Sequence, residues 1–142
     1  LLGGEFSGHI CIAERWLPFD DAIYASARLI ELLSKKDRTL SDIFTAYPST
    51  LNTPEIKVST TEDRKFEIID RLADAGGFEG GKISTIDGVR VDYEDGWGLI
   101  RASNTSPVLT LRFEGENVAA LERIKKVFQD RLSTIEPNLT FL

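Results

Sequence analysis

The sequence predicts an α+β fold, in which an antiparallel sheet of four to five strands packs against two helices, preceded by a strand and a helix that belong to an α/β domain. Short apolar runs typical of strands follow one another closely in the second half of the chain, and Asp-Gly turn signals stand before two of them. Segments with helical apolar spacing stand on both sides of this run. The length of 142 residues, with 42% hydrophobic and 28% charged residues, is typical of a folded chain with room for one good core.

The N-terminal third predicts a loop, a strand and a helix. Residues 3–8 contain three glycines and are expected to form a loop, and the apolar run 9–13 is expected to be a short strand. Asp20 or Asp21 can cap the helix that follows, and a short helical stretch is expected around 40–46. The apolar face of the first helix consists of Ile23, Ala27, Ile30 and Leu33.

A linker is expected at residues 47–54. Two prolines with Ser, Thr and Asn between them disfavour a helix and leave an extended crossing. We therefore divide the chain into residues 1–48 and residues 49–142.

The second part begins with a strand and contains two helices. The helix at 62–75 has apolar residues at helical spacing, and the helix at 117–132 ends the regular structure. The expected apolar positions are Phe66, Ile69, Leu72 and Ala73 in the first of them, and Leu121, Ile124, Phe128 and Leu132 in the second. Two helices separated by a series of hairpin strands are expected to pack on one face of an antiparallel sheet.

The expected strands are short and joined by tight turns. Asp87-Gly88 and Asp95-Gly96 are strong hairpin signals, which favours an antiparallel meander. The predicted strands are residues 56–59, 82–86, 89–93, 97–102 and 108–113.

The overall charge excludes a general role in binding nucleic acid. The chain has 17 Lys and Arg against 23 Asp and Glu, a formal net charge of -6, which is the wrong sign for a phosphate-backbone binder. A small anionic ligand would have to be held by a few local cations and backbone amides. Each arginine is therefore informative by its position.

The cysteine and histidine content excludes two further classes of protein, those held by internal disulfides and those built on a Cys/His zinc site. With Cys11 as its single cysteine and His9 as its single histidine, the chain can form neither an internal disulfide nor a Cys/His zinc site. No run approaches the length of about 20 apolar residues that spans a bilayer, so we expect a cytoplasmic protein with no membrane partner. The chain begins with Leu1 and has no methionine, which indicates a fragment of a longer protein.

A first candidate loop lies between two predicted strands, at residues 101–107. The guanidinium of Arg101 matches two phosphate oxygens, and the side chains of Ser103, Asn104 and Thr105, together with turn amides, offer neutral donors that can close around an anion. The alternative is that these polar residues only make a tight turn and that Arg101 is a solvated charge.

A second candidate loop lies at residues 3–9. Glu5 can accept hydrogen bonds from a sugar diol and Ser7 can donate and accept, and on an extended backbone both side chains project to the same side. The alternative is a flexible loop with an exposed carboxylate. Ser7 and His9 also invite a nucleophile-and-base reading, but no acidic partner follows from spacing, so we interpret His9 as a hydrogen-bonding or partly buried residue.

Together these motifs resemble the α-D-phosphohexomutase superfamily, in the bacterial phosphomannomutase/phosphoglucomutase branch. The resemblance rests on Gly-Gly-Glu-Phe-Ser-Gly-His at 3–9, Glu14-Arg15-Trp16, and Arg-Ala-Ser-Asn-Thr-Ser-Pro at 101–107. Related phosphoglucosamine mutases typically have Arg-Pro-Ser-Gly-Thr-Glu-Pro in the last motif, so its form here favours hexose phosphates, of mannose, glucose or both.

The resemblance implies a four-domain enzyme, of which residues 1–48 would be the end of the third domain and 49–142 the fourth. It implies that Glu5, Ser7 and His9 bind the sugar. It also implies that the loop with Arg101, Ser103, Asn104 and Thr105 grips the substrate phosphate.

The resemblance further implies a phosphoserine enzyme that interconverts hexose 1-phosphate and hexose 6-phosphate, with Mg²⁺ as cofactor and glucose 1,6-bisphosphate as intermediate and activator. The phosphoserine motif and the magnesium loop have no counterpart in these residues, so we expect binding without catalysis, with the other domains of the parent chain as partners. The competing hypothesis is a stand-alone α+β protein-interaction module that is indifferent to phosphosugars and exposes an apolar patch.

Overall fold

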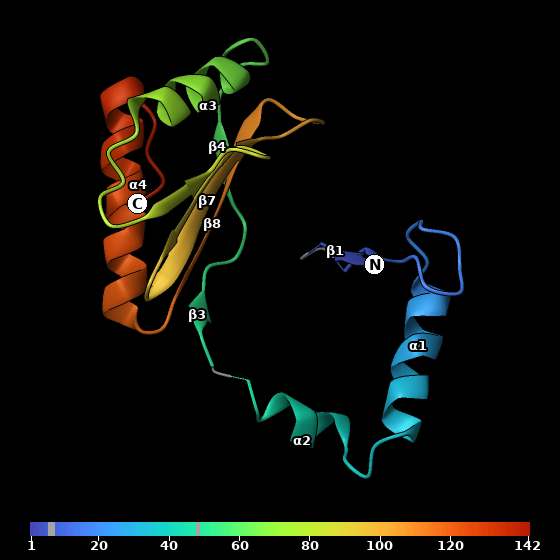
Figure 1. Ribbon diagram of the computed structural model, residues 1–142. Helices are drawn as coiled ribbons and strands as arrows, with labels where there is room; N and C mark the ends of the chain where they lie inside the picture. Colours follow the sequence, from blue (N-terminus) through green and yellow to red (C-terminus); the bar gives the residue numbers. More distant parts are fainter. Residues whose placement is uncertain (6–7, 48) are drawn as a thin grey trace. The chain divides into compact units, whose positions relative to one another are not determined.

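A computed structural model describes residues 1–5, 8–47 and 49–142 (Figure 1). The chain divides into two compact units, Leu1–Pro48, called unit 1, and Ser49–Leu142, called unit 2. Among the described residues, no helix combines the length and the apolar content that a membrane crossing requires.

Unit 1 contains a short hairpin and two helices. Strand β1, Leu2–Gly4, pairs antiparallel with β2, Ile10–Ile12, so that Gly3 lies opposite Cys11. The expectation that residues 3 and 4 belong to a loop is therefore wrong. Their glycines do not prevent pairing, because a neighbouring apolar strand supplies the backbone partners that local propensity does not predict.

The helices of unit 1 begin at polar caps. Helix α1, Ala22–Ser34, is capped by Asp21, whose side chain accepts a hydrogen bond from the Tyr24 amide at 2.9 Å. Helix α2, Leu40–Phe44, begins with a capping box between Thr39 and Asp42. Both helices match the expected segments, but neither contains a buried residue. Unit 1 is thus ordered by caps and surface contacts rather than by a core.

Unit 2 is built on an antiparallel sheet, which confirms the predicted fold class. Its strands are β3 (Leu51–Asn52), β4 (Ile56–Ser59), β5 (Lys82–Ser84), β6 (Val89–Tyr93), β7 (Gly96–Ala102) and β8 (Val108–Gly115). The order is β3-β8-β7-β6-β5, and β4 also pairs with β8. Each ladder is antiparallel, as the meander of tight turns predicts.

The expected linker contributes a strand that the sequence did not reveal. Leu51 and Asn52 pair with the end of β8, and the backbone pairing continues at Thr53, whose amide donates to the Phe113 carbonyl at 2.9 Å. The Thr53 hydroxyl accepts from the Phe113 amide at 3.2 Å. Both β3 and β4 pair with β8, and with them the described sheet has six strands, against the four to five expected.

Two helices cover one face of the sheet (Figure 1). Helix α3, Arg64–Ala75, packs against β6 and β7, and α4, Val118–Ile135, packs against β7 and β8. The core between them consists mainly of Val58, Ile68, Leu72, Phe78, Val89, Val91, Ile100, Leu109, Leu111, Phe113, Ile124, Phe128, Leu132 and Ile135. The apolar face of α4 is therefore as predicted, with its last three expected positions buried.

The buried face of α3 agrees with the prediction at Leu72, which is buried, and at Ile69 and Ala73, which pack against the core, but not at Phe66. Phe66 is 50% exposed, whereas Ile68 and Leu72 are buried, and Lys65 is buried with them. These three buried positions have the spacing i, i+3, i+7 of one helix stripe. The prediction placed Phe66 inward on apolar spacing alone, but the stripe that meets the sheet begins one residue earlier, at Lys65.

Candidate functional site

The loop between β7 and β8 is closed by its own backbone. The Ser103 amide donates to the Val108 carbonyl at 3.0 Å, and the Val108 amide donates to the Ser106 carbonyl at 2.8 Å. The strands on either side, Gly96–Ala102 and Val108–Gly115, form the centre of the sheet and alternate buried with half-buried residues. The loop is therefore fixed at both ends by a well-packed part of unit 2.

Two hydroxyl groups meet inside this loop. The Ser103 Oγ and Thr105 Oγ1 atoms lie 3.4 Å apart, and the Thr105 amide donates to Ser103 Oγ at 3.3 Å. Asn104 lies between them in the sequence and is exposed. The structure thus brings these three predicted residues together in one turn, with two hydroxyls and an amide side chain within a few residues.

Arg101 is the next-to-last residue of β7, two residues before the turn that begins at Ser103. Its side chain is 40% exposed, and its Nη1 donates to the Asp87 Oδ2 atom at 3.1 Å. A guanidinium has five N–H donors in a planar fork, so one carboxylate contact leaves donors for a second anion. The contact with Asp87 shows that the Arg101 guanidinium is accessible to an anionic oxygen.

Gly88 allows the β5–β6 turn to lie against this arginine. Its φ angle is +84°, and a Cβ atom there would lie 2.4 Å from the Ile100 carbonyl oxygen and 2.6 Å from the Arg101 Cβ. Only glycine fits such a left-handed position at this close approach. Asp87 is thereby held next to Arg101. The sequence predicted the hairpin turn at Asp87-Gly88 but not this ion pair.

The second candidate loop closes the β1–β2 hairpin of unit 1. The Glu5 amide donates to the His9 carbonyl at 2.9 Å, and the Gly8 amide donates to the Glu5 carbonyl at 3.1 Å. The His9 Nδ1 atom lies 3.4 Å from Glu5 Oε2. The hairpin therefore brings together two of the three residues predicted here, and the third, Ser7, lies outside the described residues.

Asp20 joins this second loop, which sequence spacing did not indicate. Its Oδ2 lies 3.8 Å from the His9 Nε2 atom, and its Oδ1 accepts the Ile10 amide at 3.0 Å. The sequence suggested Asp20 only as one of two possible helix caps, and Asp21 takes that role. Two carboxylates and an imidazole in one place can hold several hydroxyls of a polyol.

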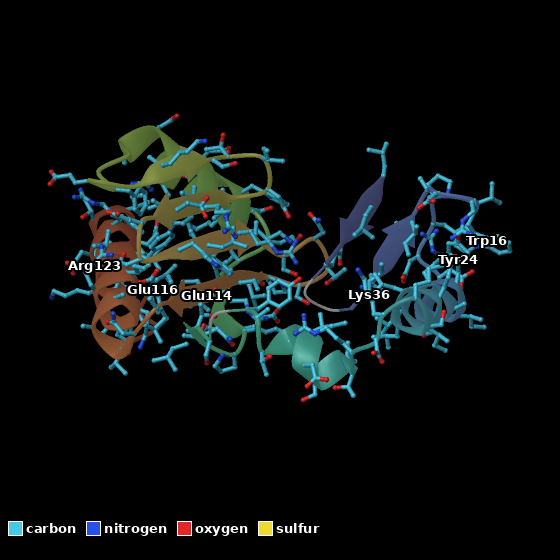
Figure 2. All side chains as sticks on the ribbon, turned by 60° about the horizontal axis from the view of Figure 1, so that its bottom comes forward. Trp16, Tyr24, Lys36, Glu114, Glu116 and Arg123 are labelled. Carbon is cyan, nitrogen blue, oxygen red and sulfur yellow. The ribbon has the colours of Figure 1, made fainter. Side chains whose placement is uncertain are left out.

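A network of ion pairs and rings joins α1 of unit 1 to the segment Glu14-Arg15-Trp16. Trp16 stacks on Tyr24, with ring centroids 5.1 Å apart (Figure 2), and the Arg28 Nη1 atom donates to the Tyr24 hydroxyl at 3.2 Å. Hydrogen bonds from Arg15 and Lys35 lower the pKa of Glu31 from 4.5 to about 2. This network orders the Glu14-Arg15-Trp16 motif, which lies at the surface.

The described residues offer no obvious metal centre. No group of three or more His, Cys, Asp or Glu side chains among residues 1–5, 8–47 and 49–142 is arranged to hold a metal ion. The side chains of the two loops can bind anions and hydroxyls by hydrogen bonds and charge.

Comparison with protein families places both units in one family. Residues 55–131 match the family model of the phosphoglucomutase/phosphomannomutase C-terminal domain, and residues 1–51 match that of alpha/beta/alpha domain III. The loop at 101–107 lies within the first match and the loop at 3–9 within the second.

Curated relatives agree with these models. The chain is 53% identical to a phosphomannomutase/phosphoglucomutase of Pseudomonas putida and 47% identical to a phosphoglucomutase of Neisseria meningitidis, each over 98% of this chain. It spans only 30% of the length of each of these two relatives. The crystal structure of a phosphoglucomutase/phosphomannomutase family protein from Burkholderia thailandensis is similar with a TM-score of 0.85 and 41% identity, over 99% of this chain and 30% of that one.

Proposed function

The chain belongs to the phosphoglucomutase/phosphomannomutase family, and from that membership we propose that it is the substrate-binding C-terminal part of a phosphohexose mutase. The parent enzyme would interconvert the 1-phosphate and 6-phosphate of glucose, mannose or both. Membership of an enzyme family favours this function over a stand-alone protein-interaction module. We also propose a cytoplasmic enzyme, a location in keeping with the single free thiol at Cys11.

The observation that carries the proposal is the loop at residues 101–107. Arg101 supplies a charged fork, and the hydroxyls of Ser103 and Thr105 lie 3.4 Å apart on the adjoining turn. A phosphate dianion takes up such a set of donors, because charged hydrogen bonds to its oxygens are about twice as strong as neutral ones. Because Asp87 engages only one of the guanidinium nitrogens, the substrate phosphate would bind the remaining N–H donors of Arg101.

In this proposal the loop at residues 3–9 recognises the sugar ring. The Glu5 carboxylate accepts hydrogen bonds from hydroxyls, and His9, 3.4 Å from Glu5, can donate or accept. Ser7 is the third proposed sugar ligand and lies outside the described residues. Hydroxyl recognition through a few adaptable polar groups suits a mutase, which must bind its sugar phosphate in two orientations.

The chemical step is proposed to take place on other parts of the parent chain. A phosphoserine there would transfer its phosphoryl group to the free hydroxyl of the substrate, forming glucose 1,6-bisphosphate or its mannose counterpart, and would recover a phosphoryl group after the sugar reorients. Mg²⁺ would be held outside the described residues and would offset charge on the transferred group. Arg101 and the loop hydroxyls would keep the other, unreacting phosphate in place.

The test is a titration of the isotope-labelled chain with glucose 1-phosphate, followed by NMR. We expect shifts of the Ser103 to Thr105 amides and a Kd on the order of millimolar or lower. Replacing Arg101 by Ala should weaken binding at least about tenfold, because a charged hydrogen bond is worth about 1.5–3 kcal/mol.

The matched control is Arg90→Ala. Arg90 lies on β6 of the same sheet, but its guanidinium pairs with Asp92 and lies 4.2 Å from the centre of the Trp97 ring. We expect this variant to bind as tightly as the unmodified chain. Equal binding by the Arg101 variant, or equal losses in both variants, would contradict the proposed role of the loop.

A further inference from the structure

Lys65, in the first turn of α3, is fully buried. Its side chain is 0% exposed, although lysine is among the residues least often found inside a protein. Burying an ammonium group away from water is costly unless hydrogen bonds and an opposite charge compensate for the lost hydration. The burial of a lysine at this position therefore calls for a specific explanation.

The ammonium group is tied to the loop that holds Arg101. The Lys65 Nζ atom donates to the Ser106 carbonyl oxygen at 3.3 Å and to Glu62 Oε1 at 2.5 Å. It also lies 5.0 Å from the centre of the Phe66 ring. Of these partners only Ser106 is distant in sequence, so this contact connects the start of α3 with the second half of the loop.

A neighbouring backbone contact strengthens the same connection. The Thr60 amide donates to the Pro107 carbonyl at 2.9 Å, one residue beyond the Ser106 carbonyl that Lys65 contacts. The Pro107 ring also fixes its own φ angle and restricts Ser106 to extended conformations. The segment from β4 to α3 thus holds the last two carbonyl groups of the loop.

We propose that Lys65 is a positioning residue for phosphate binding, an inference that rests on the proposed function. Its ammonium group donates to the Ser106 carbonyl oxygen and offsets the partial negative charge of that oxygen. The same oxygen accepts the Val108 amide at 2.8 Å, so with Lys65 both of its lone pairs are engaged, and an incoming phosphate meets hydroxyl and N–H donors on the loop. The buried positive charge also favours an anion at the loop, since charge interactions are stronger where water is excluded.

A purely structural role predicts a different result on substitution. Methionine has nearly the length of lysine and no charge, so Lys65→Met fills the same space and removes the desolvation cost. Such a variant should fold at least as well as the unmodified chain if packing is the only role. It cannot donate to the Ser106 carbonyl or carry charge.

The experiment compares the binding of glucose 1-phosphate by the unmodified chain, Lys65→Met and Glu62→Gln, alongside urea unfolding of each. We expect Lys65→Met to bind roughly tenfold more weakly, because the loop loses the contact at Ser106 that positions it and the nearby positive charge that favours an anion, with an unfolding midpoint that is unchanged or higher. Glu62→Gln keeps the ammonium group and its bond to Ser106, so its affinity should not fall.

Equal affinity of the Lys65→Met variant and the unmodified chain overturns the inference, and so does an equal loss in Glu62→Gln. If the unmodified chain itself does not bind, the proposed function fails, which is a separate outcome. The Lys65 Nζ resonance of the unmodified chain gives a second readout should Lys65→Met not fold. Glucose 1-phosphate should shift this resonance, and one that stays in place at saturation overturns the positioning role.

Discussion

The two units carry their candidate loops on different kinds of structure. In unit 2, the loop at residues 101–107 joins the two central strands of a sheet whose inner face is closed by two helices. In unit 1, the loop at residues 3–9 joins two three-residue strands, and none of the described residues of that unit is buried. One loop is fixed by a core, and the other by hydrogen bonds and ion pairs at the surface.

The comparison shows what each loop needs in order to be ready for a ligand. Apolar burial stabilises unit 2 with little dependence on salt or pH. Surface ion pairs such as Arg15 with Glu31 contribute little to stability, and salt screens them. The loop at residues 101–107 is therefore expected to be preformed in this chain, whereas the loop at residues 3–9 depends on weaker contacts that vary with salt and pH.

The largest expected effect is the loss of an aromatic side chain from the core of unit 2. Phe128 on α4 is 1% exposed, and its ring centroid lies 4.9 Å from that of Phe78 and 5.3 Å from that of Phe113. Phe128→Ala should lower the free energy of unfolding by about 3–5 kcal/mol. Urea unfolding with Trp97 as the fluorescent reporter, in a Trp16→Phe background, measures this change.

The matched variant in unit 1 is Ile30→Ala. Ile30 lies on α1 and is 67% exposed, so its truncation should change stability by no more than about 0.5 kcal/mol. Trp16 reports on this unit in a Trp97→Phe background. Comparable losses from the two substitutions would show that unit 1 has an apolar core after all.

Alanine substitutions of two glycines should show the same contrast between the units, with smaller changes in stability. A Cβ atom on Gly98 of β7 would lie 2.4 Å from the Phe128 Cε2 atom, whereas nothing lies within 4 Å of a Cβ on Gly3 of β1. Gly98→Ala should therefore destabilise unit 2 by about 1–3 kcal/mol, as overpacking does, and Gly3→Ala should be close to neutral. Urea unfolding curves for both variants decide the matter, and a neutral Gly98→Ala would contradict this description of the core.

The smallest expected effect is a dependence of unit 1 on pH. Arg15 and then Lys35 hold the pKa of Glu31 at about 2, below its ordinary 4.5. A carboxyl group whose pKa is depressed in the folded state contributes stability above its unfolded pKa, and that contribution is lost as the pH falls through its folded pKa. The order of unit 1 should therefore weaken between about pH 4.5 and 2.

Trp16 fluorescence in the Trp97→Phe background follows this transition, because Trp16 stacks on Tyr24 within the same network (Figure 2). Glu31→Gln is the control, since it removes the titrating group. If the pH profile of Trp16 is the same with and without Glu31, the ion network does not order this unit.

The sequence predicted the architecture of unit 2 well because its signals are local. Asp87-Gly88 and Asp95-Gly96 set the hairpins, and the spacing of Ile124, Phe128 and Leu132 set the buried face of α4. Strand β3 was missed because Leu51–Asn52 has only two residues, too few for a periodic signal, and its partner is far away in β8.

The surroundings of the candidate site were less predictable because they depend on tertiary contacts. Asp87 lies 14 residues from Arg101 and Ser106 lies 41 residues from Lys65, so no short-range pattern connects either pair. A lysine in a helix is ordinarily read as solvent-exposed, and its burial beneath a loop is decided by the packing of α3 on the sheet. The sequence identified the polar residues of the two loops, but it could not predict which distant residues contact them.

The measurement that tests the contrast between the two units most directly is amide hydrogen exchange along the whole chain. Amides of the strands β7 and β8, beside the loop at residues 101–107, should be protected by a factor on the order of a thousand or more, as a global stability of about 5 kcal/mol implies. Amides of α1 and the β1–β2 hairpin should exchange far faster, close to free-peptide rates. Equal protection in both units would contradict the account, because it would mean that the two candidate loops rest on equally stable structure.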